Sequence, residues 1–208
     1  MAIFNYNSER PFRGNPDLHL HYWGREKCAS GHSVGPGVRD LYKIHFIHEG
    51  TGQVSVGEYS HNLQAGQAFL TYPHIVTYYA ADSHTPWTYS WIAFTGEQVE
   101  YLLSKTSLSP EQPVFPMDDL MMPELYERLT QAAEITDSLD LPLKAILYQF
   151  FALLLQTVPA SPDILPIPKQ KSIYVEQCLH FLHSHYCENV TVEMMSSTLK
   201  LDRKYLSS

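Results

Sequence analysis

The sequence has little cysteine and no long apolar run. Its 208 residues include three cysteines, Cys28, Cys178 and Cys187. This odd number, without paired spacing, indicates neither a disulfide framework nor a cysteine-based metal site. The longest apolar stretch, 145–155, is interrupted by polar residues and is too short to span a membrane, and the N-terminus lacks the apolar core of a signal peptide. We therefore expect a protein of the reducing cytoplasm with no membrane partner.

Excess positive charge is also missing. The formal net charge is −8, which argues against a protein that coats nucleic acid. Residues 171–208 contain four basic and four acidic residues, so the whole negative excess lies in residues 1–170. The hydrophobic fraction of 44% with only 17% charged residues indicates a globular chain. We expect its two parts to have different functions.

Residues 20–94 have the pattern of an antiparallel β-domain. Short runs rich in Tyr, Val, Ile and Phe are separated by glycine and proline at the spacing of a sandwich or barrel. After Gly96 the apolar residues recur at helical spacing, which predicts helices over 118–135 and 141–158. The apolar face of the second helix is wide, which favours packing on two sides.

A cluster of prolines in residues 159–168 predicts a linker. Beyond it, the pattern predicts an amphipathic helix over 172–186, a short helix over 192–199, for which Asn189 or Thr191 offers a cap, and a further helix opening at Arg203. We therefore divide the chain into a domain over 1–158, a linker over 159–170 and a partial domain over 171–208.

This order of elements resembles that of AraC-family transcription regulators, and so do the residues. The C-terminal runs resemble the opening helices and first recognition helix of the family's DNA-binding domain. Runs in the first domain resemble the branch of the family that regulates oligosaccharide and α-galactoside use. The matching segments are 31–36, 38–40, 44–46, 63–73, 86–94, 174–182, 188–193 and 201–207.

The resemblance implies an α+β chain: a cupin-like double-stranded β-barrel that binds an effector, a helical pair at 118–158 that forms a homodimer, and the truncated start of an all-α helix-turn-helix domain. We expect a sugar-responsive regulator of carbohydrate-utilisation genes, of which this chain is the sensing and dimerising part. DNA would be a partner of the full-length protein only, with Arg203, Lys204 and Tyr205 opening the recognition helix.

The candidate saccharide site lies on an aromatic strand. Trp87, Tyr89 and Trp91 alternate and so project to one side, where flat rings could stack on a sugar. Such aromatics are usually core, but the resemblance favours a pocket. The family's arabinose sensor has a ligand-binding histidine and tryptophan where this chain has Tyr89 and Trp91, and its tyrosine falls on Tyr78 or Tyr79.

The sensor's arginine, just before the Gly-x-Gly turn, is replaced by Glu49. A carboxylate accepts hydrogen bonds where arginine donates them, so we expect a saccharide other than arabinose. Arg39 could supply a guanidinium from an earlier segment, although an exposed arginine, or one paired with Asp40, is an equal alternative. The N-terminal arm, with Phe12, His19, His21, Tyr22 and Trp23, could form either a lid over the barrel or its first strand.

The residues do not indicate a metal or catalytic centre. His45 and His48 are three apart, so they should point to opposite faces of a strand, and Thr77 and Tyr78 stand where cupin enzymes have a later histidine ligand. We interpret them as ordinary surface or core-edge histidines.

Cys28 is interpreted as a structural thiol, although Arg25 and Lys27 could lower its pKa. No catalytic motif is found. We therefore expect no cofactor and no enzyme, with two alternatives: a cupin-type metal-dependent enzyme acting on a small sugar-like substrate, and a purely structural dimerisation module with a filled barrel.

Overall fold

The computed structural model divides the chain into two compact units, Met1–Asp163 and Ile164–Ser208. The residues it describes are 2–7, 17–117, 124–135, 140–160, 178, 181–182, 185, 190–199 and 201. The predicted DNA contacts Arg203, Lys204 and Tyr205 lie outside the described residues, as does most of the expected linker over 159–170.

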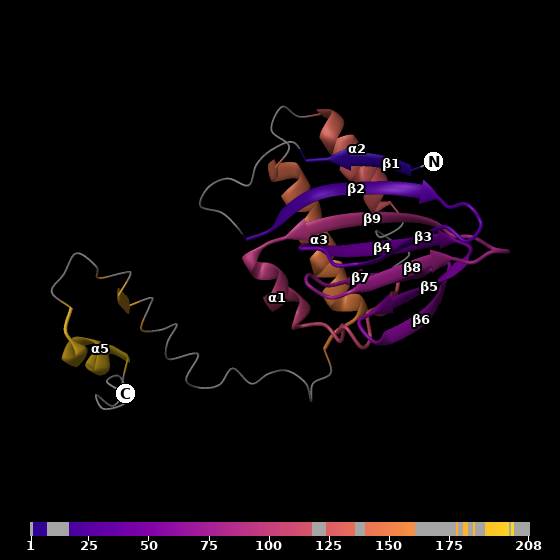
Figure 1. Cartoon of the computed structure of the whole chain (residues 1–208). Coiled ribbons are helices and arrows are strands. Elements are labelled where there is room, and N and C mark those ends of the chain that lie inside the picture. The colour runs from indigo at the N-terminus through magenta and orange to yellow at the C-terminus, as the bar shows by residue number, and fades with distance from the viewer. Residues whose placement is uncertain are drawn as a thin grey trace. The chain divides into compact units, whose positions relative to one another are not determined.

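Two antiparallel sheets make up most of the first unit (Figure 1). One has six strands in the order β1-β2-β9-β4-β7-β10, and the other has four in the order β3-β8-β5-β6. The strands are β1 (Ala2–Tyr6), β2 (His19–Lys27), β3 (Ser33–Gly37), β4 (Tyr42–Glu49), β5 (Thr51–Val56), β6 (Tyr59–Gln64), β7 (Gln67–Thr71), β8 (Thr77–Ala81), β9 (Thr88–Thr95) and β10 (Val114–Pro116). The predicted turn residues Gly57 and Gly66 both have positive φ, at 60° and 82°, where a side chain would be strained.

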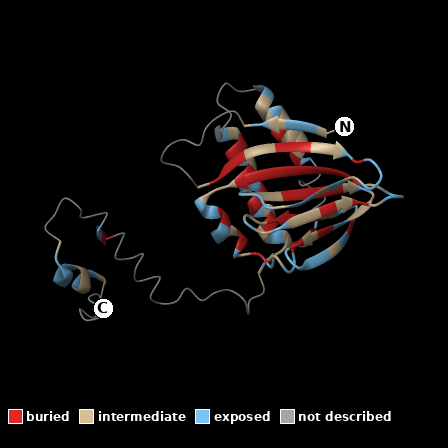
Figure 2. Cartoon of the chain, viewed as in Figure 1, coloured by how far each residue is buried: buried red, intermediate tan, exposed pale blue. Residues whose placement is uncertain are grey.

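The central strands of the larger sheet bury both of their faces. On β9, Ile92 and Phe94 belong to a core that includes the helices, whereas Tyr89 and Trp91 belong to a second core shared with the four-stranded sheet. This two-sided burial explains why β9 is almost continuously buried (Figure 2) and why five consecutive positions, Trp91–Phe94 preceded by the small Ser90, show no alternation between exposed and buried side chains. The predicted α+β class with a cupin-like double-stranded β architecture is confirmed, with the hydrogen bonds divided between two sheets.

Helices cover the outer face of the six-stranded sheet. They are α1 (Glu97–Leu103), α2 (Leu125–Ile135) and α3 (Asp140–Thr157), in good agreement with the expected pair; residues 118–123 of the first predicted helix lie outside the description. The wide apolar face of α3 packs largely within its own unit, since Leu143, Leu147, Phe150, Phe151 and Leu154 are all buried in the core beneath it.

In the second unit, the described residues include the predicted short helix, α5 (Val192–Leu199). The backbone N–H of Met194 donates to Thr191 Oγ1 at 3.2 Å, which makes Thr191 the N-terminal cap.

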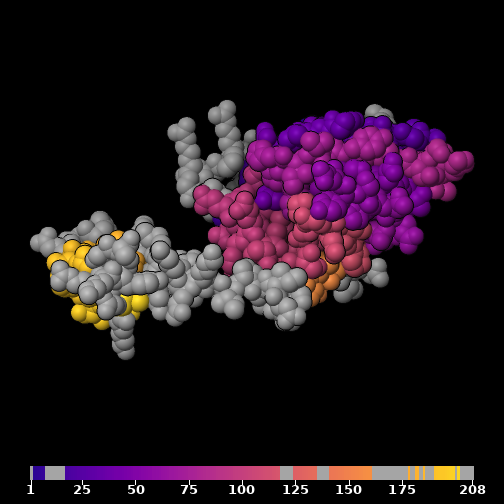
Figure 3. All heavy atoms as spheres, turned by 60° about the horizontal axis from the view of Figure 1, so that its bottom comes forward, coloured from indigo at the N-terminus to yellow at the C-terminus, as the bar shows by residue number. Residues whose placement is uncertain are grey.

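In the space-filling view, strand residues form most of the visible face of the first unit (Figure 3). None of the described helices is long and apolar enough to cross a membrane.

Candidate functional site

A small cavity lies between the two sheets, where β4 faces β3 and β8. Its volume is about 70 Å³, enough for about two water molecules. Rings of Tyr22, Tyr72 and Tyr79 form part of its wall, and its polar lining includes Arg39, Lys43, His45 and Thr71. The cavity therefore combines ring faces with hydrogen-bonding groups.

His45, on β4, lies completely buried in this wall. Its ring stacks on Phe69, with centroids 4.4 Å apart and planes at 10°, and lies 4.7 Å from the ring of Tyr79. Neither ring nitrogen has a hydrogen-bond partner among the described residues. Burial, together with the Lys43 charge, holds the pKa of His45 well below its usual value, so the imidazole is neutral and offers one donor and one acceptor.

Lys43 lies two residues earlier on the same strand and lines the same cavity. Its Nζ is 4.9 Å from the ring centroid of Trp91 and 5.9 Å from that of Tyr22, so the ammonium faces two aromatic rings. No described carboxylate forms an ion pair with it. Burial, and then the charge of Arg39, lowers the pKa of Lys43 to about 8.

Arg39 lies at the mouth of the cavity, in the connection between β3 and β4. Its side chain is exposed, and Nη1 donates to the carbonyl of Val38 at 2.9 Å. A Cβ placed on Gly37 would lie 3.0 Å from this nitrogen, so the guanidinium folds back along its own loop. Within the described part of the chain, this contact to its own loop is the one hydrogen bond found for the guanidinium.

The two candidate tyrosines of β8 point to opposite sides. Tyr79 is buried and lines the cavity, whereas Tyr78 is absent from the interior core and, by strand alternation, faces outward. Of the two, Tyr79 is therefore the one that lines the cavity.

Tyr89 and Trp91 form a layer beside the cavity. Both are almost completely buried, with ring centroids 5.3 Å apart, and Tyr89 lies 5.5 Å from the ring of His45. The predicted same-side projection of Trp87, Tyr89 and Trp91 is confirmed by their shared core. The space around these rings is filled, so they support the cavity wall and are not among the residues that line it.

Glu49 and His48 also lie away from the cavity. The register between β4 and β9 shifts between Ile47 and Glu49, and Glu49 is exposed at the strand end, where its Oε2 accepts a hydrogen bond from Thr88 Oγ1 at 3.4 Å. The expectation that Glu49 faces the pocket is not met. The register shift places Glu49 at the exposed end of the strand, outside the space between the two sheets. His48 contacts Ser90 Oγ on the helix side, so His45 and His48 do face opposite ways; the expectation of a surface or core-edge position is wrong for His45.

The N-terminal residues form a strand, the second of the two alternatives. β1 pairs antiparallel with β2, which contains His19, His21, Tyr22 and Trp23, while Phe12 lies outside the described residues. The exposed ring of Phe4 lies 5.0 Å from that of Trp91, and the exposed ring of Tyr6 lies 5.8 Å from that of Tyr22. β1 thus extends the aromatic inner face past the cavity.

Cys28 is buried next to this layer. Burial, and then the negative charge of Glu26, raises the pKa of its thiol to about 11. The lowering by Arg25 and Lys27 considered from sequence is therefore not found. Arg25 instead forms an ion pair with Glu127, which directs its charge toward α2.

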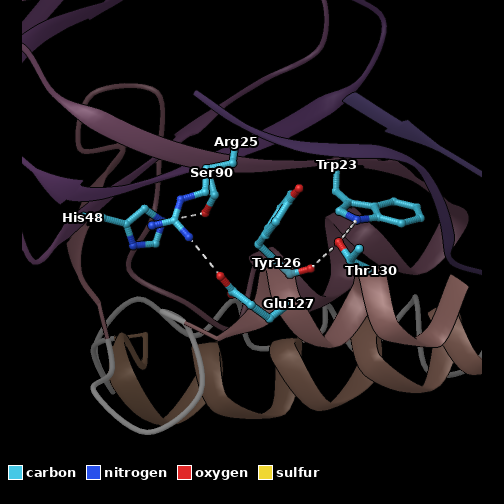
Figure 4. A network of polar contacts seen from close by, with 7 residues as sticks. All are labelled: Trp23, Arg25, His48, Ser90, Tyr126, Glu127 and Thr130. Carbon is cyan, nitrogen blue, oxygen red and sulfur yellow. Dashed lines mark hydrogen bonds and ion pairs between the residues drawn. The ribbon is translucent and has the colours of Figure 1, made fainter. Parts of the chain in front are cut away.

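Polar contacts connect the six-stranded sheet to α2 (Figure 4). Arg25 Nη1 donates to Glu127 Oε1 at 2.9 Å, and Trp23 Nε1 donates to Thr130 Oγ1 at 3.1 Å. Because side chains alternate along β2, Trp23 and Arg25 face the helix while their neighbour Tyr22 lines the cavity. A displacement of this strand would therefore reach the helix through short, specific contacts.

Sequence reasoning missed Tyr22, Lys43 and His45 as cavity residues. One signal was available: a lysine two residues before a histidine in an otherwise apolar strand places two polar groups on one inward face. A second concavity, of about 780 Å³, lies over β5, β6 and β8; it is lined by polar side chains such as Gln53, Asn62 and Asp82 and by no aromatic ring. The smaller cavity is the better candidate, because it pairs ring faces with unbonded polar groups.

Comparison with known proteins gives consistent relatives. The model of a family described as the AraC-like ligand binding domain matches residues 19–160. The Msm operon regulatory protein of Streptococcus mutans is 32% identical over 99% of this chain and 74% of its own length. The raffinose operon transcriptional regulatory protein RafR of Pediococcus pentosaceus is 28% identical over 89% and 68%, respectively.

Solved structures give a weaker likeness. The protein YhaK of Escherichia coli superimposes with a TM-score of 0.41 at 16% identity, over 46% of this chain and 45% of that one.

Proposed function

The chain belongs to the family defined by the AraC-like ligand-binding domain, and from this premise we propose that it is the sensing part of a sugar-responsive transcription regulator. Its relatives are named as regulators of the Msm and raffinose operons, which supports a saccharide effector and DNA as the partner of the whole protein. We further propose that it acts in the cytoplasm and has no catalytic activity.

The observation that carries the effector proposal is the unbonded polar lining of the barrel cavity. Neither buried ring nitrogen of His45 has a hydrogen-bond partner among the described residues, and no described carboxylate lies within ion-pair distance of Lys43. Buried polar groups are nearly always hydrogen-bonded, so these groups are suited to a ligand rich in hydroxyls. Tyr22 and Tyr79 supply the flat faces that a sugar ring packs against.

The cavity must enlarge to admit a sugar. Pockets for small molecules typically occupy about 300–1,000 Å³, several times the present volume of about 70 Å³. Arg39 is exposed and locally bonded, so rotation of its side chain is the simplest opening. In the bound form Arg39, Lys43, His45 and Tyr79 would donate or accept hydrogen bonds, with Tyr89 and Trp91 as the supporting layer.

A homodimer through the helical pair is also proposed. Leu141, Ala145, Tyr148, Ala152 and Leu155 follow one another at alternating steps of four and three residues on α3. The first four are exposed in the single chain and the last is partly exposed. Such spacing is that of a coiled-coil seam, and the buried residues of α3 already face the sheet. The seam is thus available to a second copy.

The effector proposal is tested by calorimetric titration of the chain with mono- and oligosaccharides, α-galactosides included. We expect one saccharide class to bind and raise the melting temperature, because a ligand that binds only the folded state stabilises it. His45→Leu, which keeps the core apolar, should weaken binding at least about tenfold through the loss of hydrogen bonds in a buried site.

His84→Leu, at an exposed position, is the matched control and should bind as the parent does. Trp91 gives a second test: Trp91→Ala should also weaken binding, because it removes the ring that faces the Lys43 ammonium. Unchanged binding in both His45→Leu and Trp91→Ala would remove this cavity from the effector site.

A further inference from the structure

Three chemically distinct side chains meet at the rim of the barrel, outside the proposed effector cavity. Glu26 lies near the end of β2, Cys28 follows that strand, and His32 precedes β3. Their ligand atoms, a carboxylate oxygen, the thiol sulfur and a ring nitrogen, all lie within 4.8 Å of one another. His32 Nε2 and Glu26 Oε2 are 3.7 Å apart.

These donors suit a borderline-soft divalent cation. Zinc takes thiolate, imidazole and carboxylate ligands at about 2.0–2.3 Å in a tetrahedron, which places neighbouring ligand atoms roughly 3.3–3.8 Å apart. The Glu26–His32 separation of 3.7 Å already lies in this range, and since all three atoms lie within 4.8 Å of one another, no separation exceeds the range by more than about 1 Å. Rotation of the side chains alone can close that difference.

The backbone between the three donors is held by hydrogen bonds. The N–H of Cys28 donates to the carbonyl of Trp87 at 3.1 Å, and the N–H of His32 donates to the carbonyl of Ala29 at 3.1 Å, closing a turn. The carbonyl of His32 accepts from the N–H of Ala81 at 2.8 Å. These contacts hold the backbone of Cys28 and His32, and Glu26 is held by pairing with Tyr89 of β9, which lowers the entropic cost of assembling a metal site.

The exposed fraction of the three side chains increases from Cys28 to Glu26 to His32. Cys28 is 6% exposed, while the side chains of Glu26 and His32 are 17% and 34% exposed, so an ion can enter past the imidazole. Tyr89 donates its hydroxyl to Glu26 Oε2 at 3.3 Å. Such an outer hydrogen bond orients a ligating carboxylate.

We propose that Glu26, Cys28 and His32 bind a Zn²⁺-class cation, with a fourth coordination position open to solvent. On binding, the Cys28 thiol releases its proton to solvent and the thiolate bonds to the metal. The site is separate from His45 and His48, whose spacing argued against a cupin-type metal centre. It does not depend on the chain being a saccharide sensor.

The test uses the whole chain after removal of metals with a chelator, titrated with Co²⁺ and then with Zn²⁺. Cobalt bound to a thiolate gives a charge-transfer absorption band that carboxylate or imidazole ligands do not give. We expect one equivalent of Co²⁺ with this band, displacement by Zn²⁺, and release of protons on binding.

Matched variants assign the ligands. Cys28→Ser should abolish the charge-transfer band, whereas Cys178→Ser, in the second unit, should keep it. His32→Gln, at a partly exposed position that folding tolerates, should weaken Zn²⁺ binding at least about tenfold, and His84→Gln should not. Circular dichroism of each variant checks that it is folded. Absence of a thiolate band in the parent chain, or its retention in Cys28→Ser, overturns the proposal, and so does equal Zn²⁺ affinity in His32→Gln and the parent.

Discussion

At the scale of single residues, the inner face of β4 places two polar side chains against the aromatic interior, and one of them, His45, has no hydrogen-bond partner among the described residues. Lys43 and His45 both lie on the inner face of β4, and both have pKa values lowered first by burial. Their presence costs folding free energy, since a charge or an unbonded nitrogen in a core is unfavourable. Replacing such a group by an apolar one should therefore raise the free energy of unfolding and weaken effector binding. This is the usual trade-off between stability and function at binding sites.

Lys43→Met should stabilise the folded chain at neutral pH and weaken saccharide binding. The pKa of Lys43 falls from 10.5 to about 8 on folding, so its contribution is most favourable above pH 10.5 and is lost as the pH falls through 8. The stability gained by the variant should therefore be larger at pH 7.5 than at pH 10. Urea unfolding at the two pH values measures it, with exposed Lys27→Met as the control; an equal gain at both would contradict the assignment.

His45 should make the chain less stable in weak acid. Burial holds the pKa of His45 well below the ordinary histidine value of 6.5, so below about pH 6.5 the unfolded chain binds a proton that the folded chain does not. Stability then falls by up to about 1.4 kcal/mol per pH unit for this one group. His45→Leu should lessen the loss between pH 7 and pH 5, and His84→Leu should not. If the slopes of the parent and His45→Leu coincide, His45 is protonated in the folded state.

These residues also mark where sequence reasoning ends. The alternation along 87–91 correctly placed Tyr89 and Trp91 on one inner face, because strand periodicity is a local property. Glu49 was misplaced, because the register shift after Ile47 depends on pairing with β9. Arg39 was considered as a substitute for the guanidinium that Glu49 replaces, and its position in the lining comes from the course of a loop that no periodicity specifies.

At the scale of whole elements, apolar periodicity predicted the main strands and both α2 and α3. It left the N-terminal segment undecided between lid and strand, because an edge strand is defined by its partner, here β2. It also attributed the wide apolar face of α3 to two partners. Most of that face is covered within the unit, since a helix lying on a twisted sheet and touching α2 buries residues around much of its circumference.

The hydrogen bond between Trp23 of the six-stranded sheet and Thr130 of α2 gives a prediction at the scale of whole elements. Thr130→Val leaves Trp23 Nε1, on a side chain only 1% exposed, without its acceptor, which should lower the free energy of unfolding by about 1–3 kcal/mol. Thr157→Val on α3 is the matched control, since Thr157 also donates to the carbonyl four residues earlier but accepts from no indole. Urea unfolding compares the two variants.

A double-mutant cycle separates this hydrogen bond from packing. Trp23→Phe and Thr130→Val should together cost less than the sum of the single changes, by about 0.5–1.5 kcal/mol, because the double variant leaves no unbonded donor. Strict additivity would show that this hydrogen bond contributes nothing to the free energy of unfolding. The same variants, titrated with an effector, report whether the contact between β2 and α2 affects effector binding at the cavity.

At the scale of the molecule, the sensor domain needs a way to convert a change in a small cavity into a change at the helices. β2 is placed for this, because Tyr22 lines the cavity while Trp23 and Arg25 contact α2. The Arg25–Glu127 pair is about half exposed at both ends and should contribute no more than about 1 kcal/mol. The buried Trp23–Thr130 contact is thus the stiffer connection.

The proposed dimer gives the last prediction. Ala145 and Ala152 are exposed on the α3 seam, seven residues apart and so on the same side of the helix. Replacing both with glutamate should place two like charges in each half of a self-complementary contact, and such changes cost several kcal/mol in an interface. We expect a dimer of the parent chain by sedimentation equilibrium and a monomer of the Ala145→Glu, Ala152→Glu variant. Gln98→Glu, exposed on α1, adds charge off the seam and should remain dimeric. A variant that stays dimeric with both glutamates would place the dimer contact elsewhere, whereas a monomeric parent chain would contradict the dimer itself.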